Sequence, residues 1–127
     1  NPGHTLVVPK KHYKILMELS DNDISNLFKI VKDLSKAVLE STGAEGIEIR
    51  QRNGAIAGQV VPHVHVHIIP RFKDDNVPAD WTPKQLKEEQ FVEMQKRISE
   101  AIKKVAPTET KEPKKKGKLP KVPPKLP

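Results

Sequence analysis

The sequence predicts an α+β fold, in which helices cover an antiparallel sheet. Apolar side chains alternate with charged side chains in residues 46–52 and with histidines in residues 63–70, which is the pattern of β-strands. Between residues 24 and 39, apolar residues recur instead at the three- and four-residue spacing of an α-helix. The loop between the two strands is short and contains Gly54 and Gly58, which favours antiparallel pairing of these neighbours.

The elements before this loop have clear boundary signals. Residues 4–9 are rich in β-branched residues and end in proline, so they are predicted to form a first strand. The long helix is predicted to begin after Ser20, which opens a run of polar residues suited to N-capping. It is predicted to end at Gly43, because glycine commonly terminates helices.

The second half of the chain contains a predicted helix followed by a tail. Thr82 as N-cap and Pro83 at the first helical position predict a helix that runs to about residue 104. Residues 106–127 hold seven lysines, two glutamates and six prolines, with few apolar residues to bury. We therefore predict one folded domain over residues 1–105 and a disordered Lys/Pro-rich tail over residues 106–127.

Charge and composition limit the classes of partner. The net charge is +7, and the tail alone contributes +5. Its lysines are either a solvated surface or an attachment site for nucleic acid or another polyanion, which the run Lys114-Lys115-Lys116 only weakly supports. The chain has no cysteine and no apolar stretch near the roughly 20 residues that span a bilayer. We expect a soluble, cytoplasmic protein without a membrane partner.

Three of the five histidines stand at alternate positions in the segment Pro-His-Val-His-Val-His-Ile-Ile-Pro-Arg. Successive side chains of a strand point to opposite faces, so His63, His65 and His67 are predicted to share one face. The apolar residues between them would point into the core. Imidazole titrates near neutrality and can act as nucleophile, acid or base, so the row suggests chemistry.

Three explanations compete for this histidine row. Buried structural histidines are common, but three in perfect alternation are unusual. A metal site is a second explanation: two of the three could share a zinc ion with carboxylates, but the Cα atoms of His63 and His67 would lie roughly 13 Å apart, so all three would fit poorly. The third explanation is covalent catalysis at phosphorus, in which the central imidazole attacks and its neighbours hydrogen-bond the charged oxygens and the leaving group.

The segments around the row resemble the histidine triad (HIT) family of nucleotide hydrolases and transferases. The resemblance lies in Asn53-Gly54, Ala57-Gly58-Gln59, the three histidines, Ile69-Pro70-Arg71 and the earlier segment from Asn1-Pro2-Gly3-His4 to His12. It implies a HIT-like sheet of about five antiparallel strands with a long helix and a C-terminal helix. It also implies a homodimer joined through the long helix and a strand. No resident cofactor or metal is implied, although a divalent metal can enter with the nucleotide.

The resemblance assigns a role to each matching residue. His65 would attack the α-phosphorus and form a nucleotidyl-histidine intermediate, which water then hydrolyses. His67 would bind the phosphate and assist the leaving group, while His63 and His4 would support His65 and the phosphate. Contacts with the phosphate are further implied for the loop residues Asn53, Gly58 and Gln59.

The substrate is less well defined by the resemblance. Family members carry a further N-terminal segment with residues for the base and ribose, so we expect part of the family domain to be missing before Asn1. The ending His-Ile-Ile-Pro-Arg is more similar to dinucleoside polyphosphate hydrolases and unassigned prokaryotic members than to nucleoside phosphoramidases. We expect hydrolysis of a nucleoside or dinucleoside polyphosphate. The alternatives are a nucleoside phosphoramidase and a non-catalytic module that binds nucleotides or polyanions.

Overall fold

The computed structural model describes residues 1–78 and 81–105 and confirms the α+β fold. The predicted tail over residues 106–127 lies outside the described residues. The chain divides into two compact units at residue 79. The elements in chain order are β1 (Thr5–Val7), the 3-10 helix η1 (Leu16–Glu18), α1 (Asp21–Thr42), β2 (Gly46–Arg50), the 3-10 helix η2 (Ala55–Ala57), β3 (Val66–Arg71) and α2 (Glu88–Val105).

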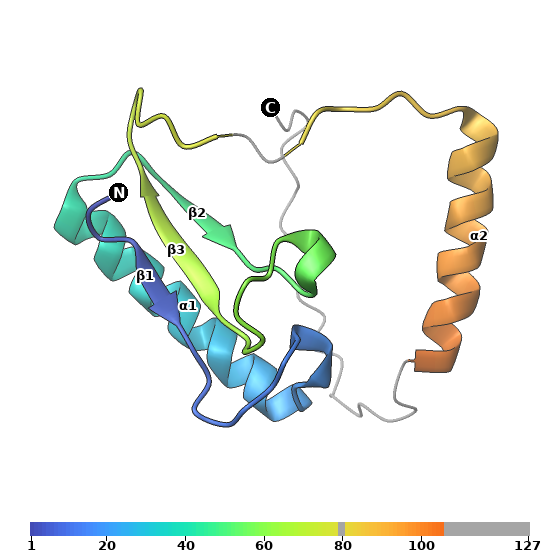
Figure 1. The fold of residues 1–127 in the computed structure, drawn as a ribbon, viewed down its shortest axis with the longest axis horizontal. Helices are drawn as coiled ribbons and strands as arrows, with labels where there is room; N and C mark the ends of the chain where they lie inside the picture. The colour runs from blue at the N-terminus through green and yellow to red at the C-terminus, as the bar shows by residue number, and fades with distance from the viewer. Residues whose placement is uncertain (79–80, 106–127) are drawn as a thin grey trace, which may run out of the picture. The chain divides into compact units, whose positions relative to one another are not determined.

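The sheet is antiparallel, with β3 between β1 and β2 (Figure 1). His67 on β3 lies opposite Leu6 of β1 on one side and opposite Arg50 of β2 on the other. The described residues form three strands, whereas the family resemblance implied about five. The central strand therefore carries the end of the histidine row, and both neighbours can contribute side chains beside it.

The long helix α1 forms where the sequence predicts it. The Ser20 hydroxyl accepts a hydrogen bond from the Asp23 N–H at 3.1 Å, which satisfies a donor of the first turn. Gly43 ends the helix in the left-handed conformation (φ 68°), which glycine adopts without the steric cost of a Cβ atom. The helix packs along one face of the sheet (Figure 1) and buries Leu27, Val31 and Val38.

The core lies between α1 and the sheet. Val64, Val66 and Ile68 are fully buried, which confirms that the residues between the histidines point inward. Tyr13 joins this cluster, and its hydroxyl donates to the carboxylate of Asp23 near the start of α1. This hydrogen bond lowers the pKa of Asp23. The histidine segment is thus part of the strongest packing in the unit.

The histidine strand begins later than predicted. β3 starts at Val66, so His63 and His65 precede it. Residues 61–63 form a bend, in which the His63 N–H donates to the Val61 carbonyl at 2.8 Å. The Val64 N–H then donates to the Tyr13 carbonyl, also at 2.8 Å. This single backbone hydrogen bond to Tyr13 replaces regular pairing with β1. The side chains still point alternately into the core and out of it.

The C-terminal helix also begins later than predicted. It starts at Glu88, and the expected cap at Thr82-Pro83 lies outside it. Lys87 precedes the first turn instead: its N–H donates to Gln90 Oε1 at 2.9 Å, and its carbonyl accepts from the Gln90 N–H at 3.0 Å. Within residues 1–78 and 81–105, neither long helix combines the length and hydrophobicity needed to cross a membrane.

Candidate active site

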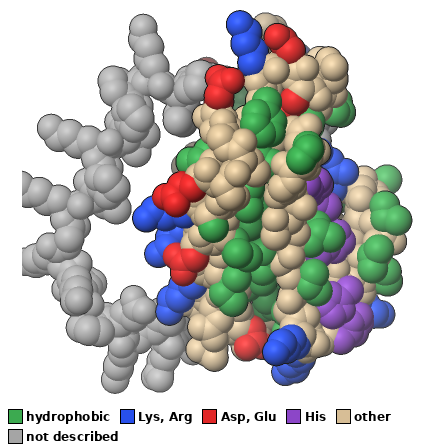
Figure 2. Space-filling view, turned by 90° about the vertical axis from the view of Figure 1, so that its left-hand side faces the viewer, with side chains coloured by type: hydrophobic (Ala, Val, Ile, Leu, Met, Phe, Trp, Pro, Cys, Tyr) green, Lys and Arg blue, Asp and Glu red, His purple; other side chains and the backbone are tan. Residues whose placement is uncertain are grey.

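The histidines lie together on the surface of the first unit. Figure 2 shows their side chains as a purple column with hydrophobic side chains beside it. His63, His65 and His67 are each partly buried, unlike the fully buried valines and isoleucine between them. The structure therefore brings the predicted row onto one face, although only His67 lies within a regular strand.

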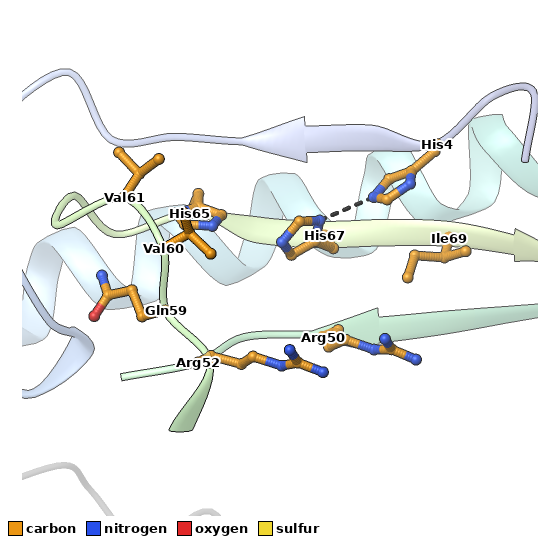
Figure 3. Close-up of a pocket in the computed structure, with 10 residues that line it drawn as sticks. His4, Arg50, Arg52, Gln59, Val60, Val61, His65, His67 and Ile69 are labelled. Atoms are coloured by element: carbon orange, nitrogen blue, oxygen red, sulfur yellow. Dashed lines mark hydrogen bonds between the residues drawn. The ribbon is translucent and has the colours of Figure 1, made fainter. Parts of the chain in front are cut away.

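A cavity of about 280 Å³ opens beside this column. His65 and His67 line it together with His4, which directly precedes β1 (Figure 3). The remaining lining residues are Arg50, Arg52, Gly58, Gln59, Val60, Val61 and Ile69. We call this cavity the histidine–arginine pocket. His63 does not line it and instead borders a second hollow with Leu6, Val8, Val61 and His65.

The hydrogen bond of His65 defines its tautomer. Its Nδ1 lies 2.7 Å from the backbone carbonyl oxygen of His63, which can only accept a hydrogen bond. The Nδ1 atom must therefore carry a proton and donate. A neutral imidazole has one protonated and one unprotonated nitrogen, so Nε2 of His65 has the available lone pair.

His67 is coupled to the N-terminal segment. Its Nδ1 lies 2.9 Å from Nε2 of His4, at hydrogen-bonding distance (Figure 3). Burial lowers the pKa of His67, and the charges of nearby histidines and arginines lower it further; these neighbours are His4, His65, Arg50 and Arg52. A lowered pKa keeps His67 neutral at physiological pH, so its ring can still hydrogen-bond in either direction.

His63 is held by the segment that follows β1. Its Nε2 lies 3.0 Å from the Pro9 carbonyl oxygen, so Nε2 donates. Its Nδ1 lies 2.8 Å from Nδ1 of His12. When His63 is neutral, Nδ1 must accept from His12, and the ring orientation is fixed from both sides. This arrangement fits the supporting role predicted for His63, because the carbonyl of the same residue orients His65.

The loop before the histidines brings Gln59 and Gly58 into the pocket, but not Asn53. Gln59 is anchored at both ends of its amide: Oε1 accepts from the Gly54 N–H at 2.8 Å and Nε2 donates to the Lys14 carbonyl at 2.7 Å. Asn53 does not line the pocket. Its Oδ1 accepts from the Leu16 N–H at 2.8 Å, and its Nδ2 donates to Gln51 Oε1 at 2.7 Å.

Arg50 and Arg52 were missed by the sequence analysis, although both line the pocket. The signal was present in the alternation of residues 46–52, which sends both arginines to one face. Without the register between β2 and β3, however, the sequence did not indicate that this face adjoins His67. Arg50 lies directly opposite His67 in the sheet.

An ion-pair network supports the arginine side of the pocket. Glu48 Oε1 accepts from Nη2 of Arg50 at 2.6 Å, and its Oε2 accepts from Nη1 of Arg71 at 2.6 Å. Arg71 also binds both carboxylate oxygens of Asp75. The hydrogen bond from Arg50 lowers the pKa of Glu48, and the Arg71 hydrogen bond holds that of Asp75 far below its usual range.

The metal alternative finds no support in the arrangement of the described residues. No group of three or more His, Asp or Glu side chains within this part of the chain is placed to hold a metal ion. The imidazoles instead pair with one another, as His4 with His67 and His12 with His63.

Residues 1–74 match the HIT domain. The chain belongs to the HIT family. A structure of the histidine triad nucleotide-binding protein from Candida albicans superposes with a TM-score of 0.69 at 32% identity, covering 81% of this chain and 76% of that one. The shared fold confirms the architecture that the resemblance implied.

Similar proteins include hydrolases that act on different nucleotides. An uncharacterized HIT-like protein of Methanocaldococcus jannaschii is 44% identical over 68% of this chain and 74% of its own length. Adenosine 5'-monophosphoramidase of Schizosaccharomyces pombe is 36% identical over 80% of this chain and 74% of its own length. The asymmetrical bis(5'-nucleosyl)-tetraphosphatase of the same yeast is 40% identical over 58% of this chain and 41% of its own length. These relatives support an enzyme of the nucleotide hydrolase class.

Proposed function

We propose that this HIT protein is a nucleotidyl hydrolase that acts at the α-phosphate of a nucleoside or dinucleoside polyphosphate, with His65 as nucleophile. The observation that carries the proposal is the 2.7 Å hydrogen bond from His65 Nδ1 to the His63 carbonyl. It leaves the lone pair on Nε2 in a residue that lines the histidine–arginine pocket. A nucleophilic imidazole needs this combination of a fixed tautomer and an accessible second nitrogen.

The reaction proceeds in two displacements. His65 Nε2 forms a bond to the α-phosphorus while the bond to the leaving group breaks, and the leaving group departs with that electron pair. Water then attacks the phosphorus of the nucleotidyl-histidine, which releases the nucleotide, the imidazole and a proton. Hydrogen-bond donors beside the phosphate stabilise the charge that develops in both steps.

The neighbouring residues have separate tasks in this proposal. His67, with Nδ1 accepting from His4, presents its Nε2–H to the phosphate and the leaving group. His63 orients His65 through its carbonyl, and His12 and Pro9 hold His63 in turn. Gln59 and Gly58 bring the loop against the phosphate. No resident cofactor takes part; a divalent metal would enter with the nucleotide.

Hydrolysis of a nucleoside phosphoramidate is the second candidate function. It is favoured by the yeast phosphoramidase, whose match extends over more of both sequences than the match to the tetraphosphatase. Both reactions use the same covalent intermediate and differ only in the leaving group. The shared intermediate therefore tests the enzyme, and a comparison of substrates tests the branch.

The homodimer that the resemblance implies stays a prediction. Phe28 and Leu39 of α1 and Ile49 of β2 are exposed in the single chain. A second copy that met these two elements would cover apolar side chains that water now contacts. The polyanion partner predicted for the tail likewise remains a proposal.

The test is trapping of the covalent intermediate. Wild-type protein and His65→Ala are mixed rapidly with radiolabelled diadenosine tetraphosphate or adenosine phosphoramidate, quenched in alkali and examined for an acid-labile label. We expect one adenylyl group per wild-type site and none on His65→Ala. Absence of adduct and turnover in the wild type, with equal nucleotide binding by both proteins, would support the non-catalytic module instead.

A further inference from the structure

Two guanidinium groups stand beside the histidines and have no task in the two displacements described above. Arg50 and Arg52 both line the histidine–arginine pocket. Figure 3 shows their side chains extending in the same direction, away from Gln59 and toward the end of the pocket where Ile69 lies. They form one wall of the pocket, and the histidines form the other.

The position of Arg50 is fixed by the sheet. Its backbone pairs with His67 in the β2–β3 register. Glu48 Oε1 accepts from Nε at 3.0 Å and from Nη2 at 2.6 Å, so the guanidinium is held by two hydrogen bonds on one side. Its side chain is only 18% exposed. A cation held in this way loses little conformational entropy when an anion binds.

The position of Arg52 depends on Gly58. A Cβ atom at residue 58 would lie 2.7 Å from Nη1, 3.2 Å from Cδ and 3.4 Å from Cζ of Arg52. The arginine therefore packs against the backbone of the loop that also provides Gln59. The absence of a side chain at residue 58 makes room for a guanidinium at this place, in addition to allowing the positive φ of 93°.

This wall holds two guanidinium groups, and the Glu48 carboxylate, which is shared with Arg71, offsets part of their charge. The α-phosphate attacked by His65 carries one negative charge, and an amine leaving group adds none. A leaving group that is itself a phosphate brings further charges, and guanidinium groups bind phosphate oxygens through paired N–H donors. Burial, and then neighbouring charges that include both arginines, lower the pKa of His67, so His67 stays neutral beside the arginine wall.

We infer that Arg50 and Arg52 form a subsite for an anionic leaving group, so that the preferred substrates are adenosine polyphosphates rather than phosphoramidates. This inference rests on the proposed function and names the substrate class of the same site. When His65 Nε2 bonds to the α-phosphorus, the bond from that phosphorus to the bridging oxygen breaks. The electron pair stays on that oxygen, where the two guanidinium groups offset the new charge.

The test compares two substrates that differ in the leaving group alone. We would measure kcat/KM for diadenosine tetraphosphate and for adenosine phosphoramidate with the wild type, Arg52→Gln and Arg52→Lys. Arg52→Gln is expected to lower the ratio of tetraphosphate to phosphoramidate kcat/KM by about tenfold to a hundredfold, the range for loss of a hydrogen bond to a charged group. Arg52→Lys keeps the charge but lacks the paired N–H donors of a guanidinium, so its ratio should lie between those of the wild type and Arg52→Gln.

The matched control is Arg97→Gln. Arg97 lies on α2, pairs with Glu93 at 3.0 Å and is not one of the residues that line the pocket, so its replacement removes the same charge without changing the lining. The ratio should stay within twofold of the wild type. An equal loss on both substrates with Arg52→Gln, or no loss on either, would overturn the subsite.

A binding measurement separates failure of the subsite from failure of the proposed enzyme. His65→Ala cannot form the adduct, so equilibrium binding of AMP and ATP can be compared in that background. Adding Arg52→Gln should weaken ATP about tenfold more than AMP. If the wild type forms no adduct but this difference appears, the enzyme proposal fails and the anionic subsite stands. If the adduct forms and the difference is absent, the reverse holds.

Discussion

The two walls of the pocket are built by different means. The histidine wall is aligned by single hydrogen bonds, from His65 to a backbone carbonyl and between His67 and His4. The arginine wall is aligned by strand register, by the carboxylate of Glu48 and by a glycine in the next loop. The first wall comes mainly from five consecutive residues, whereas the second depends on contacts between separate segments. This difference explains why a local sequence motif predicts the histidines more easily than the arginine charge beside them.

Of the further changes, replacement of Gly58, which displaces Arg52, should have the largest effect. Gly58→Ala places a methyl group against the Arg52 guanidinium and should displace it. We expect kcat/KM for diadenosine tetraphosphate to fall about tenfold or more, as for loss of a charged hydrogen bond. Adenosine phosphoramidate hydrolysis should fall less, since its leaving group carries no charge.

Gly43→Ala is the matched control for this change. Gly43 is also in the left-handed region (φ 68°, ψ 18°, against φ 93°, ψ 12° for Gly58), but a Cβ atom there meets nothing within 4 Å. Both variants therefore carry a similar backbone cost, about 1–2 kcal/mol, and only one displaces Arg52. Equal kinetics for the two variants would show that the arginine wall does not depend on Gly58.

Asn53 differs from the residues of both walls, because it supports the loop without lining the pocket. Asn53→Ala removes the acceptor for the Leu16 N–H and the donor to Gln51. We expect the free energy of unfolding in urea to fall by about 1–2 kcal/mol, as for lost buried hydrogen bonds. Asn53→Asp keeps the acceptor and should lose less. A raised KM with unchanged stability would return Asn53 to the phosphate-binding role that the sequence predicted.

The smallest expected effect is a pH dependence of stability that belongs to His67. Its pKa is lowered in the folded state, mainly by burial, so the unfolded chain binds the proton first as pH falls. Stability is therefore full above about pH 6.5, the ordinary histidine pKa, and declines as pH falls toward the lowered value. Urea unfolding of His67→Gln should show a smaller decline over this window.

Carboxylates do not obscure this window. The pKa values of Asp23, Glu48 and Asp75 are all lowered, so their contributions are lost only below the ordinary carboxyl range, at still more acidic pH. A decline between neutral pH and pH 5 that is identical in His67→Gln and the wild type would show that His67 does not cause it.

Local signals predicted well those parts of the fold that local contacts determine. The helix α1 begins after Ser20 and ends at Gly43 as predicted, because capping involves residues only a few positions apart. The alternation around His65 also predicted which side chains are buried. The predicted start of α2 was wrong, because the N-terminal contacts of the helix are formed by Lys87 and Gln90 and not by Thr82. Lysine has no side-chain acceptor and is not a typical N-cap residue, so the sequence around Lys87 gave no signal as strong as the one at Thr82.

Predictions that depended on the path of the chain were less successful. Asn53 was placed with the phosphate, but its amide is used by Leu16, which lies far away in the sequence. The arginines were overlooked because their distance from His67 is decided by pairing between β2 and β3. A local motif can predict the histidines, whereas the pairing of the strands determines which charged side chains lie beside them.

The central position of β3 has a consequence for the dynamics of the site. The segment that carries His65 and His67 also provides Val64, Val66 and Ile68, which have no exposed surface. Local opening costs least where few apolar contacts are buried, and this segment has the opposite character. We therefore expect the backbone of His65, the proposed nucleophile, to be displaced only when the core as a whole opens. Any adaptation to the proposed nucleotide substrates would then fall to the loop of Gly58 and Gln59.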